Sequence, residues 1–252
     1  MKLSLIIPAY NEEKRNLIPT LNEYHKGLTK EFGTDFELII IPNNCTDNTE
    51  GVVRDWIKDN HPRAWSHVIK GGKSGKTKGS VVMKGFDMAQ GDWIGFVDAD
   101  NATTVKEFLK CYRGIGYKKG LIPNDGVIAS RRKIGAKISP PRRWTQSLSS
   151  WLFNFVVNLL FGLGIWDTQC GCKLFSKRCA KFLVKNHTET GWNFDVDLLY
   201  LCQVYGFKIR EHPINWTDFP GGQVSTLDGI KAVLLLFKYR IKKWKDLFLN
   251  RL

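Results

Sequence analysis

Two aspartates, Asp98 and Asp100, stand one residue apart directly after the apolar run WIGFV. Two carboxylates this close repel each other, and behind a buried strand they are costly unless a cation joins them. A hard ion such as Mg²⁺ or Mn²⁺ takes one or two carboxylates and then the oxygens of a nucleotide diphosphate. A solvated turn, or the Walker B strand of an NTPase, would give the same pattern. The spacing therefore makes Asp98 and Asp100 candidate metal ligands without excluding those alternatives.

The segment GGKSGKTKGS, residues 71–80, is similar to a phosphate-binding P-loop. A P-loop needs a glycine five residues before the glycine of Gly-Lys-Thr, because its backbone N–H groups must wrap the phosphates. That position is Lys70, and Gly71 is one residue too close. A nucleotide hydrolase is therefore the weaker alternative, to be recognised by hydrolysis without a sugar acceptor.

Apolar runs and helical stretches alternate through the first hundred residues. The predicted strands are LSLIIPA, FELIII over 36–41, SHVIK over 66–70 and DWIGFV, and the predicted helices cover 16–32, a stretch from Thr49, and 80–90. Strands joined by helices through short polar loops indicate an α/β fold with a mostly parallel sheet. Such sheets bind ligands beyond the carboxyl ends of their strands.

Polar side chains follow three of the predicted strands. They are Tyr10 and Glu12 after the first, Asn43 and Asp47 after the second, and Asp98 and Asp100 after the fourth. All are expected to meet at one edge of the sheet.

Length and charge limit the class of protein. The chain has 252 residues, 43% of them hydrophobic, which favours one domain with a functional tail, divided here as residues 1–226 and 227–252. A net charge of +14 favours phosphates, anionic lipid headgroups or nucleic acid as partners. No motif for base stacking or groove insertion appears, so nucleic acid is the weaker choice. No signal peptide is apparent, and the six cysteines lack zinc spacing, so free thiols in a reducing compartment are expected.

Six motifs in order resemble the family 2 glycosyltransferases of GT-A fold, over about residues 3–225. They are IIPAYNEE, IIIPNNCTDNT, GKTKGSVVMKGFDMAQGDWIGFVDADNATT, ASRRK, DTQCGCKLF and WNFDVDLLYL. The chain looks most like the branch of dolichyl-phosphate glucosyltransferases and mannose synthases. Lys78, Gly79 and Ser80 match the family's Lys-Gly-x-Ala loop beside the nucleotide-sugar pocket.

The resemblance assigns roles to particular residues. It implies catalytic roles for Asp98, Asp100, Arg131 and Asp197, with Asp98 and Asp100 holding Mg²⁺ or Mn²⁺ and Asp100 the principal ligand. Nucleotide-sugar contacts are implied for Pro8, Ala9, Tyr10, Glu12, Ile41, Asn43, Lys78, Asp98, Ala99 and Asp100. Contacts to an acceptor phosphate are implied for Arg131, Arg142 and Arg143, whose guanidinium forks suit phosphate oxygens.

The chain departs from the family pattern in places. Asn43 replaces a usual aspartate, and an amide both donates and accepts, which leaves uracil or guanine open. Ala102 stands where the mannose synthases often place glutamine, so UDP-glucose is favoured. Asp197 replaces a glutamate, and a structural role at a helix start competes with a catalytic one. The family's Gly-Ser-Lys motif is absent, with GGQVSTLDG in its place.

Two segments predict contact with a membrane surface. Residues 144–166 carry no charge, yet Ser147, Ser150, Asn154 and Asn158 form a polar stripe, which favours an interfacial helix over a span. A buried core helix is the alternative. The tail from Gly229 pairs apolar positions with seven basic residues and one acid, which suits an anionic membrane or docking on the catalytic domain. Peripheral attachment on the cytoplasmic face is expected, with a membrane partner subunit or homo-oligomer left open.

The combined interpretation is an inverting glycosyltransferase. A polyprenyl or dolichyl phosphate, held by the arginines, attacks the anomeric carbon of a nucleotide diphosphate-sugar while the cation neutralises the departing diphosphate. A lipid phosphate is already anionic and needs no general base. Transfer to a hydroxyl acceptor in polysaccharide synthesis is the alternative within the enzyme class.

Overall fold

Seven strands form one sheet in the order β3-β2-β1-β4-β7-β5-β8, and a second sheet pairs β6 with β9. The computed structural model describes residues 1–59, 64–66, 77–116, 124–141, 144–191, 193–219 and 226–248. The strands are β1 Leu3–Ala9, β2 Phe36–Pro42, β3 Ala64–Ser66, β4 Trp93–Val97, β5 Gly126–Ser130, β6 Lys137–Ser139, β7 Cys172–Ser176, β8 Ile209–Pro213 and β9 Asn215–Thr217. The helices are α1 Leu17–Phe32, α2 Thr49–Lys58, α3 Lys78–Met88, α4 Val105–Arg113, α5 Trp144–Phe161, α6 Lys177–Asn186, α7 Phe194–Val204 and α8 Thr226–Phe248.

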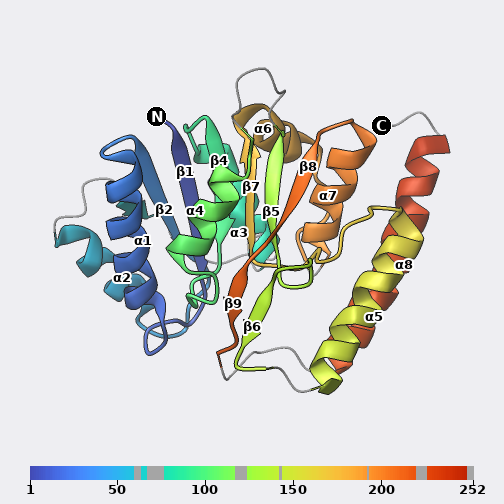
Figure 1. Ribbon diagram of the computed structural model, residues 1–252, viewed down its shortest axis with the longest axis horizontal. Coiled ribbons are helices and arrows are strands. Elements are labelled where there is room, and N and C mark those ends of the chain that lie inside the picture. Colours follow the sequence, from blue (N-terminus) through green and yellow to red (C-terminus); the bar gives the residue numbers. More distant parts are fainter. Residues whose placement is uncertain are drawn as a thin grey trace.

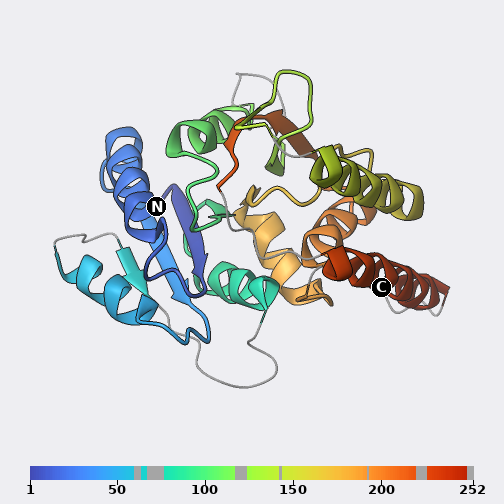
Figure 2. The ribbon, with the colours of Figure 1, turned by 90° about the horizontal axis from the view of Figure 1, so that it is seen from below.

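Strand direction decides which loops meet. β1 runs parallel to β2 and β4, and β7 runs antiparallel to both β4 and β5. The carboxyl ends of β1, β2, β4 and β5 therefore share one edge with the start of β7. This edge is the lower one in Figure 1, and Figure 2 views the molecule from that side.

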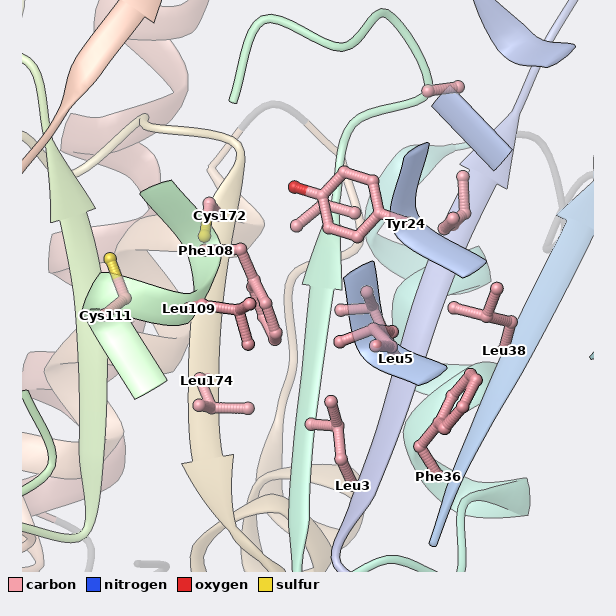
Figure 3. Packing of buried hydrophobic residues seen from close by; sticks show 14 of the residues in the cluster. Leu3, Leu5, Tyr24, Phe36, Leu38, Phe108, Leu109, Cys111, Cys172 and Leu174 are labelled. Atoms are coloured by element: carbon pink, nitrogen blue, oxygen red, sulfur yellow. The ribbon is translucent and has the colours of Figure 1, made fainter. Parts of the chain in front are cut away.

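Side-chain alternation along the strands builds two cores, one on each face of the sheet. In β1, Leu3, Leu5 and Ile7 pack with α1, α2 and α4, whereas Ile6 packs with α3, α6 and α7. Figure 3 shows Tyr24 of α1 and Phe108 of α4 over the first of these faces. Because both faces are covered, the central strands β1, β2 and β4 are mainly apolar, as is usual for parallel strands.

A third apolar cluster joins α5, α7 and α8 at one end of the sheet, where α5 and α8 pack side by side (Figure 1). It contains Val157, Phe161, Val196, Tyr200, Leu236 and Tyr239. The predicted tail helix is thus packed against the rest of the chain along one face.

Three residues of the polar stripe of α5, Ser150, Asn154 and Asn158, face the protein, whereas Ser147 is exposed. Asn154 is buried and accepts hydrogen bonds from the N–H and the hydroxyl of Thr168, and Asn158 bonds the backbone of Ile165 on both sides. Other apolar side chains point outward, with Trp151 56% and Leu159 73% exposed, while Val157 and Phe161 belong to the buried cluster with α7 and α8. α5 therefore has a buried side and an exposed apolar side.

α8 also exposes an apolar row, formed by Leu234, Leu235, Phe237 and Ile241. Within the residues the structure describes, no helix combines the length and apolar character needed to cross a membrane.

Most sequence-based elements are confirmed, including the strand over 36–41 and the helices from residues 16, 49 and 80, within two residues. The predicted third strand, residues 66–70, begins two residues after the start of β3, which covers Ala64–Ser66. Residues 67–70 lie outside the described part. The antiparallel β7 was not foreseen, because its short apolar run resembles any other buried strand. All six cysteines are free, as expected.

Candidate active site

Asp98 follows β4 and is fixed by the loop before β7. Its N–H donates to the carbonyl of Gly171 at 3.0 Å, and its carboxylate forms an ion pair with Lys78, the first residue of α3. A Cβ added to Gly171 would lie 1.8 Å from Oδ2 of Asp98. Only glycine at this position lets the carboxylate lie where it does.

Asp100 is held by the turn that follows. Its Oδ1 accepts the N–H of Ala102 at 2.9 Å, and its carbonyl accepts the side-chain amide of Asn16 on the α1 side at 3.2 Å. Asn101 completes the turn with a φ of 60°, a conformation that asparagine tolerates. Burial raises the pKa of Asp100, and the negative charge of Asp98 raises it further. A cation at this point would relieve both effects.

Glu12, after β1, lies against the same charges. It is 9% exposed, its N–H donates to Thr49 Oγ1 at 2.8 Å, and its Oε1 accepts from Arg15 at 3.2 Å. Its Oε2 is buried and has no hydrogen-bond partner in the described structure. Burial raises the pKa of Glu12 to about 7; Arg15 lowers it, and the nearby Asp100 and Asp98 raise it. An unpaired buried oxygen of this kind is suited to a hydrogen-bond donor from a ligand.

The ends of β1 and β2 meet as predicted. Pro8 lies opposite Ile41 in the parallel ladder, and Asn43 continues it by donating its N–H to the carbonyl of Ala9 at 2.9 Å. The Asn43 side chain is 6% exposed and its Oδ1 accepts from Asn44 at 3.0 Å. Tyr10 is 48% exposed and free to cover a ligand.

A buried lysine, Lys173 of β7, lies under this edge. Its Nζ donates to Asp195 at 2.5 Å and to the carbonyl of Cys170 at 2.9 Å, and it lies 5.5 Å from the ring centre of Phe96. Lys78 lies 5.4 Å from the same ring. Burial raises the pKa of Asp195, although Lys173 and Lys78 oppose this. The sequence motif DTQCGCKLF contains Lys173 and Gly171, but nothing in its spacing distinguished Gly171 as the neighbour of Asp98 or Lys173 as the partner of Asp195.

Arg131 follows β5 and therefore lies at the same edge. Burial would lower the pKa of its guanidinium, but the charge of Asp167 and, to a smaller extent, that of Asp98 raise it. Its Nε and Nη2 donate to the buried Asp167 at 2.7 and 2.8 Å. Asp167 is held in turn by Glu211, which accepts its N–H at 2.8 Å. The arginine is thus positioned by two buried carboxylates that the sequence analysis did not identify.

A pocket of ≈ 520 Å³ lies beside Arg131, between β6 and α5. It is lined by Arg131, Arg132, Ile138, Trp144, Ser147, Leu148, Ser150 and Trp151. Arg132 donates to Ser150 at 2.5 Å, which ties the loop after β5 to α5. One wall is therefore cationic and the other aromatic and aliphatic.

One predicted residue, Asp197, is not brought to this edge. Asp197 is fully buried, and its oxygens are engaged by the N–H groups of Thr188 and Glu189 and by Tyr239 and Lys243. Its catalytic role stays a prediction. Arg142 and Arg143 lie outside the described residues, as do residues 71–76 of the glycine-rich loop.

The donor set fits a hard divalent ion. Asp98 and Asp100 offer carboxylate oxygens, and no cluster of three or more histidine, cysteine or acidic residues suited to a metal occurs in the described ranges. One or two carboxylates are what Mg²⁺ or Mn²⁺ takes when phosphates supply the remaining oxygens. The site therefore suits a metal that arrives with a nucleotide diphosphate.

Comparison with known proteins adds to this geometry. The model of the glycosyl transferase family 2 matches residues 4–183. The chain belongs to this family. It is 31% identical over 257 residues to a dolichyl-phosphate beta-glucosyltransferase of Dictyostelium discoideum, covering 96% of this chain and 76% of the relative. It is 30% identical over 228 residues to the human protein of the same name, covering 88% and 69%.

Solved structures confirm the fold of this family 2 glycosyltransferase. Mannosyl-3-phosphoglycerate synthase from Rubrobacter xylanophilus has a TM-score of 0.65 at 14% identity, over 96% of this chain and 74% of that one. Glucosyl-3-phosphoglycerate synthase from Mycobacterium tuberculosis, in complex with Mn²⁺, uridine diphosphate and glucosyl-3-phosphoglycerate, has a TM-score of 0.59 at 19% identity, over 92% and 75%. The predicted family, GT-A fold and enzyme class are confirmed.

The raised pKa of Glu12 predicts a pH-dependent stability. Between pH 4.5, its usual pKa, and about 7, the folded protein keeps a proton that the unfolded chain has lost. Wild type should therefore lose about 3 kcal/mol of unfolding free energy relative to Glu12→Gln as the pH rises through this window. Urea titrations at pH 4.5 to 8 with chelator measure it.

The matched control for this experiment is Asp55→Asn, at an exposed acid of α2. A difference between wild type and Glu12→Gln that stays constant over the whole range would show that Glu12 titrates normally.

Proposed function

We propose that this enzyme transfers glucose from UDP-glucose to dolichyl phosphate, or a similar polyprenyl phosphate, with inversion at the anomeric carbon. The observation that carries the proposal is the meeting of two features at one edge of the sheet. The paired carboxylates after β4 lie there with Lys78, and Arg131 lies there beside a pocket that continues to the exposed apolar face of α5. The names of the relatives support the same acceptor and sugar.

The donor half rests on the residues after β1, β2 and β4. Asn43 and the unpaired Oε2 of Glu12 suit the nucleotide, and Tyr10 is exposed beside them to cover it. Asp98, Ala99 and Asp100 would hold the ribose and the diphosphate side, and Pro8, Ala9 and Ile41 would form the floor. Asp100, with Asp98, would hold Mg²⁺ or Mn²⁺, which supplies positive charge to the departing diphosphate.

The acceptor half rests on Arg131 and its pocket. Asp167 engages Nε and Nη2, so the guanidinium is oriented before any ligand arrives, and Nη1 would meet the acceptor phosphate. Arg142 and Arg143 are proposed to contribute to the same phosphate. Trp144, Leu148 and Trp151 would receive the first part of the lipid. A phosphate oxygen attacks the anomeric carbon directly, since it carries a charge without a general base.

Attachment to a membrane is proposed through α5 and α8, on the cytoplasmic face and without a span. Both helices expose apolar side chains, and Lys231, Lys238 and Lys242 are exposed on α8. Aromatic and basic side chains of this kind settle at the headgroup layer.

The proposal is tested by transfer assays with the purified chain. UDP-glucose and dolichyl phosphate with Mn²⁺ should give dolichyl phosphate glucose, and GDP-mannose should give much less product. Chelator should stop the reaction. Transfer that needs a hydroxyl acceptor instead of a lipid phosphate would contradict it, as would nucleotide hydrolysis with no acceptor.

Loss of the proposed metal ligand should stop transfer. Asp100→Ala should lower kcat/KM at least about a hundredfold, because the leaving diphosphate loses its neutralising charge. Asp55→Ala, on an exposed face of α2, is the matched control and should leave the rate unchanged. Turnover of Asp100→Ala equal to that of wild type would remove the metal assignment.

Charges placed on the exposed face of α5 should prevent membrane binding. Trp151→Glu combined with Leu159→Glu should weaken binding to phosphatidylcholine and phosphatidylserine vesicles at least about tenfold, because two apolar contacts are lost. The Tm should change little, since both side chains are largely exposed. Val204→Glu, at an exposed apolar residue at the end of α7, is the control. Equal sedimentation with vesicles by all three proteins would contradict this attachment.

A further inference from the structure

Lys243 of α8 is a lysine whose whole side chain is withdrawn from solvent. It is 0% exposed, its Nζ lies 3.5 Å from Oδ1 of Asp197, and it has no hydrogen-bond partner among the described residues. Asp197 is equally buried. A buried ion pair of this kind is weak evidence for stability, because desolvation of the two charges offsets their attraction. It does fix the relative position of the two elements that carry the charges.

Asp197 binds three further groups around the start of α7. The hydroxyl of Tyr239, also on α8, donates to Oδ1, and the N–H groups of Thr188 and Glu189 donate to Oδ2 at 2.6 and 3.0 Å. Burial and the charge of Asp197 raise the pKa of Tyr239, so the tyrosine is the donor in this bond. One carboxylate thus joins α8, the first turn of α7 and the segment before it.

Two other residues of the same turn, Phe194 and Asp195, contact groups of the donor site. The ring centre of Phe194 lies 5.9 Å from that of Phe96, and a Cβ on Gly79 would lie 2.6 Å from the Cβ of Phe194. Asp195 holds Lys173 at 2.5 Å. The turn therefore packs directly against the residue that follows Lys78, and it binds the lysine that lies under Asp98.

We propose that Tyr239 and Lys243 are positioning residues for the donor site. Through Asp197 they fix the first turn of α7, and that turn fixes Lys78 and Lys173 beside and beneath Asp98. The inference rests on the proposed function of this edge as the nucleotide-sugar site. The exposed side of α8 would then face the membrane, while Tyr239 and Lys243 on its buried side fix the positions of residues in the donor site.

The contact chain consists of short steps. Lys243 and Tyr239 reach Asp197, the backbone carries the constraint to Phe194 and Asp195, and these reach Gly79 and Lys173. Apart from the covalent backbone, each step is an ion pair, a hydrogen bond or a packed contact, and chains of such contacts can couple two sites. A shift of the turn would move the ammonium groups of Lys78 and Lys173, while the acceptor pocket beside β6 and α5 has none of these residues in its lining.

The test compares the effect of each substitution on the Kd of the donor, UDP-glucose, with its effect on the KM of the acceptor, dolichyl phosphate. Lys243→Met keeps the apolar stem and removes the charge, and it should raise the Kd of UDP-glucose, measured by calorimetry with Mn²⁺, roughly tenfold. The KM for dolichyl phosphate should stay within about twofold of wild type. Tyr239→Phe, which removes a single hydroxyl, should also raise the Kd of UDP-glucose, by a smaller factor. Lys30→Met, at an exposed lysine of α1, is the control and should change neither.

The outcomes separate this inference from the function on which it rests. Wild type that binds no UDP-glucose would overturn the proposed function and the inference together. Wild type that binds it, with an unchanged Kd in Lys243→Met and Tyr239→Phe and only a lower Tm, would overturn the positioning role alone. If Lys243→Met fails to fold, the Kd of Tyr239→Phe decides.

Discussion

The structure depends on one electrostatic constraint, the placing of two carboxylates at the carboxyl end of a buried strand. Asp98 and Asp100 repel each other, and the surrounding chain offsets that repulsion in part. Lys78 pairs with Asp98, Gly171 leaves room for its carboxylate, and the N–H of Ala102 meets Asp100. Burial raises the pKa of Asp100 and of Glu12, and the remaining excess of negative charge raises both further. A divalent ion with a diphosphate is the ligand that this excess charge suits best.

The rest of the molecule connects the site around Asp98 and Asp100 to a surface on which α5 and α8 expose apolar side chains. Helix α5 points Ser150 and Asn154 toward Arg132 and Thr168, whereas Trp151 and Leu159 face outward. Helix α8 repeats the arrangement with a buried ion pair inside and an apolar row outside. Helix α7 lies between them and the sheet, and its first turn touches both the donor side and α8. Chemistry on a water-soluble sugar nucleotide and contact with a lipid are thereby placed at neighbouring parts of one fold.

The sequence predicted much of this, for physical reasons that can be stated. Strands such as LSLIIPA are apolar on both faces because helices cover both. Polar residues after them mark one edge of the sheet, so the position of Glu12, Asn43, Asp98 and Asp100 at that edge was predicted from their place after the strands. Residues that support others were not found. Gly171, Lys173, Asp167 and Glu211 act through contacts between segments far apart in the chain, and no local spacing reports such contacts. The polar stripe of α5 was seen, but its direction depends on where Thr168 and Arg132 lie, which only the fold determines.

The central claim is that the carboxylates after β4 hold a divalent ion against the diphosphate of a sugar nucleotide. Diffraction from crystals grown with UDP and Mn²⁺, measured at the manganese absorption edge, tests it most directly. The account predicts an anomalous peak bonded to Asp100, with Asp98 beside it and the diphosphate oxygens completing the shell. UDP bound elsewhere, or bound at this edge with manganese coordinated by other residues, would contradict it.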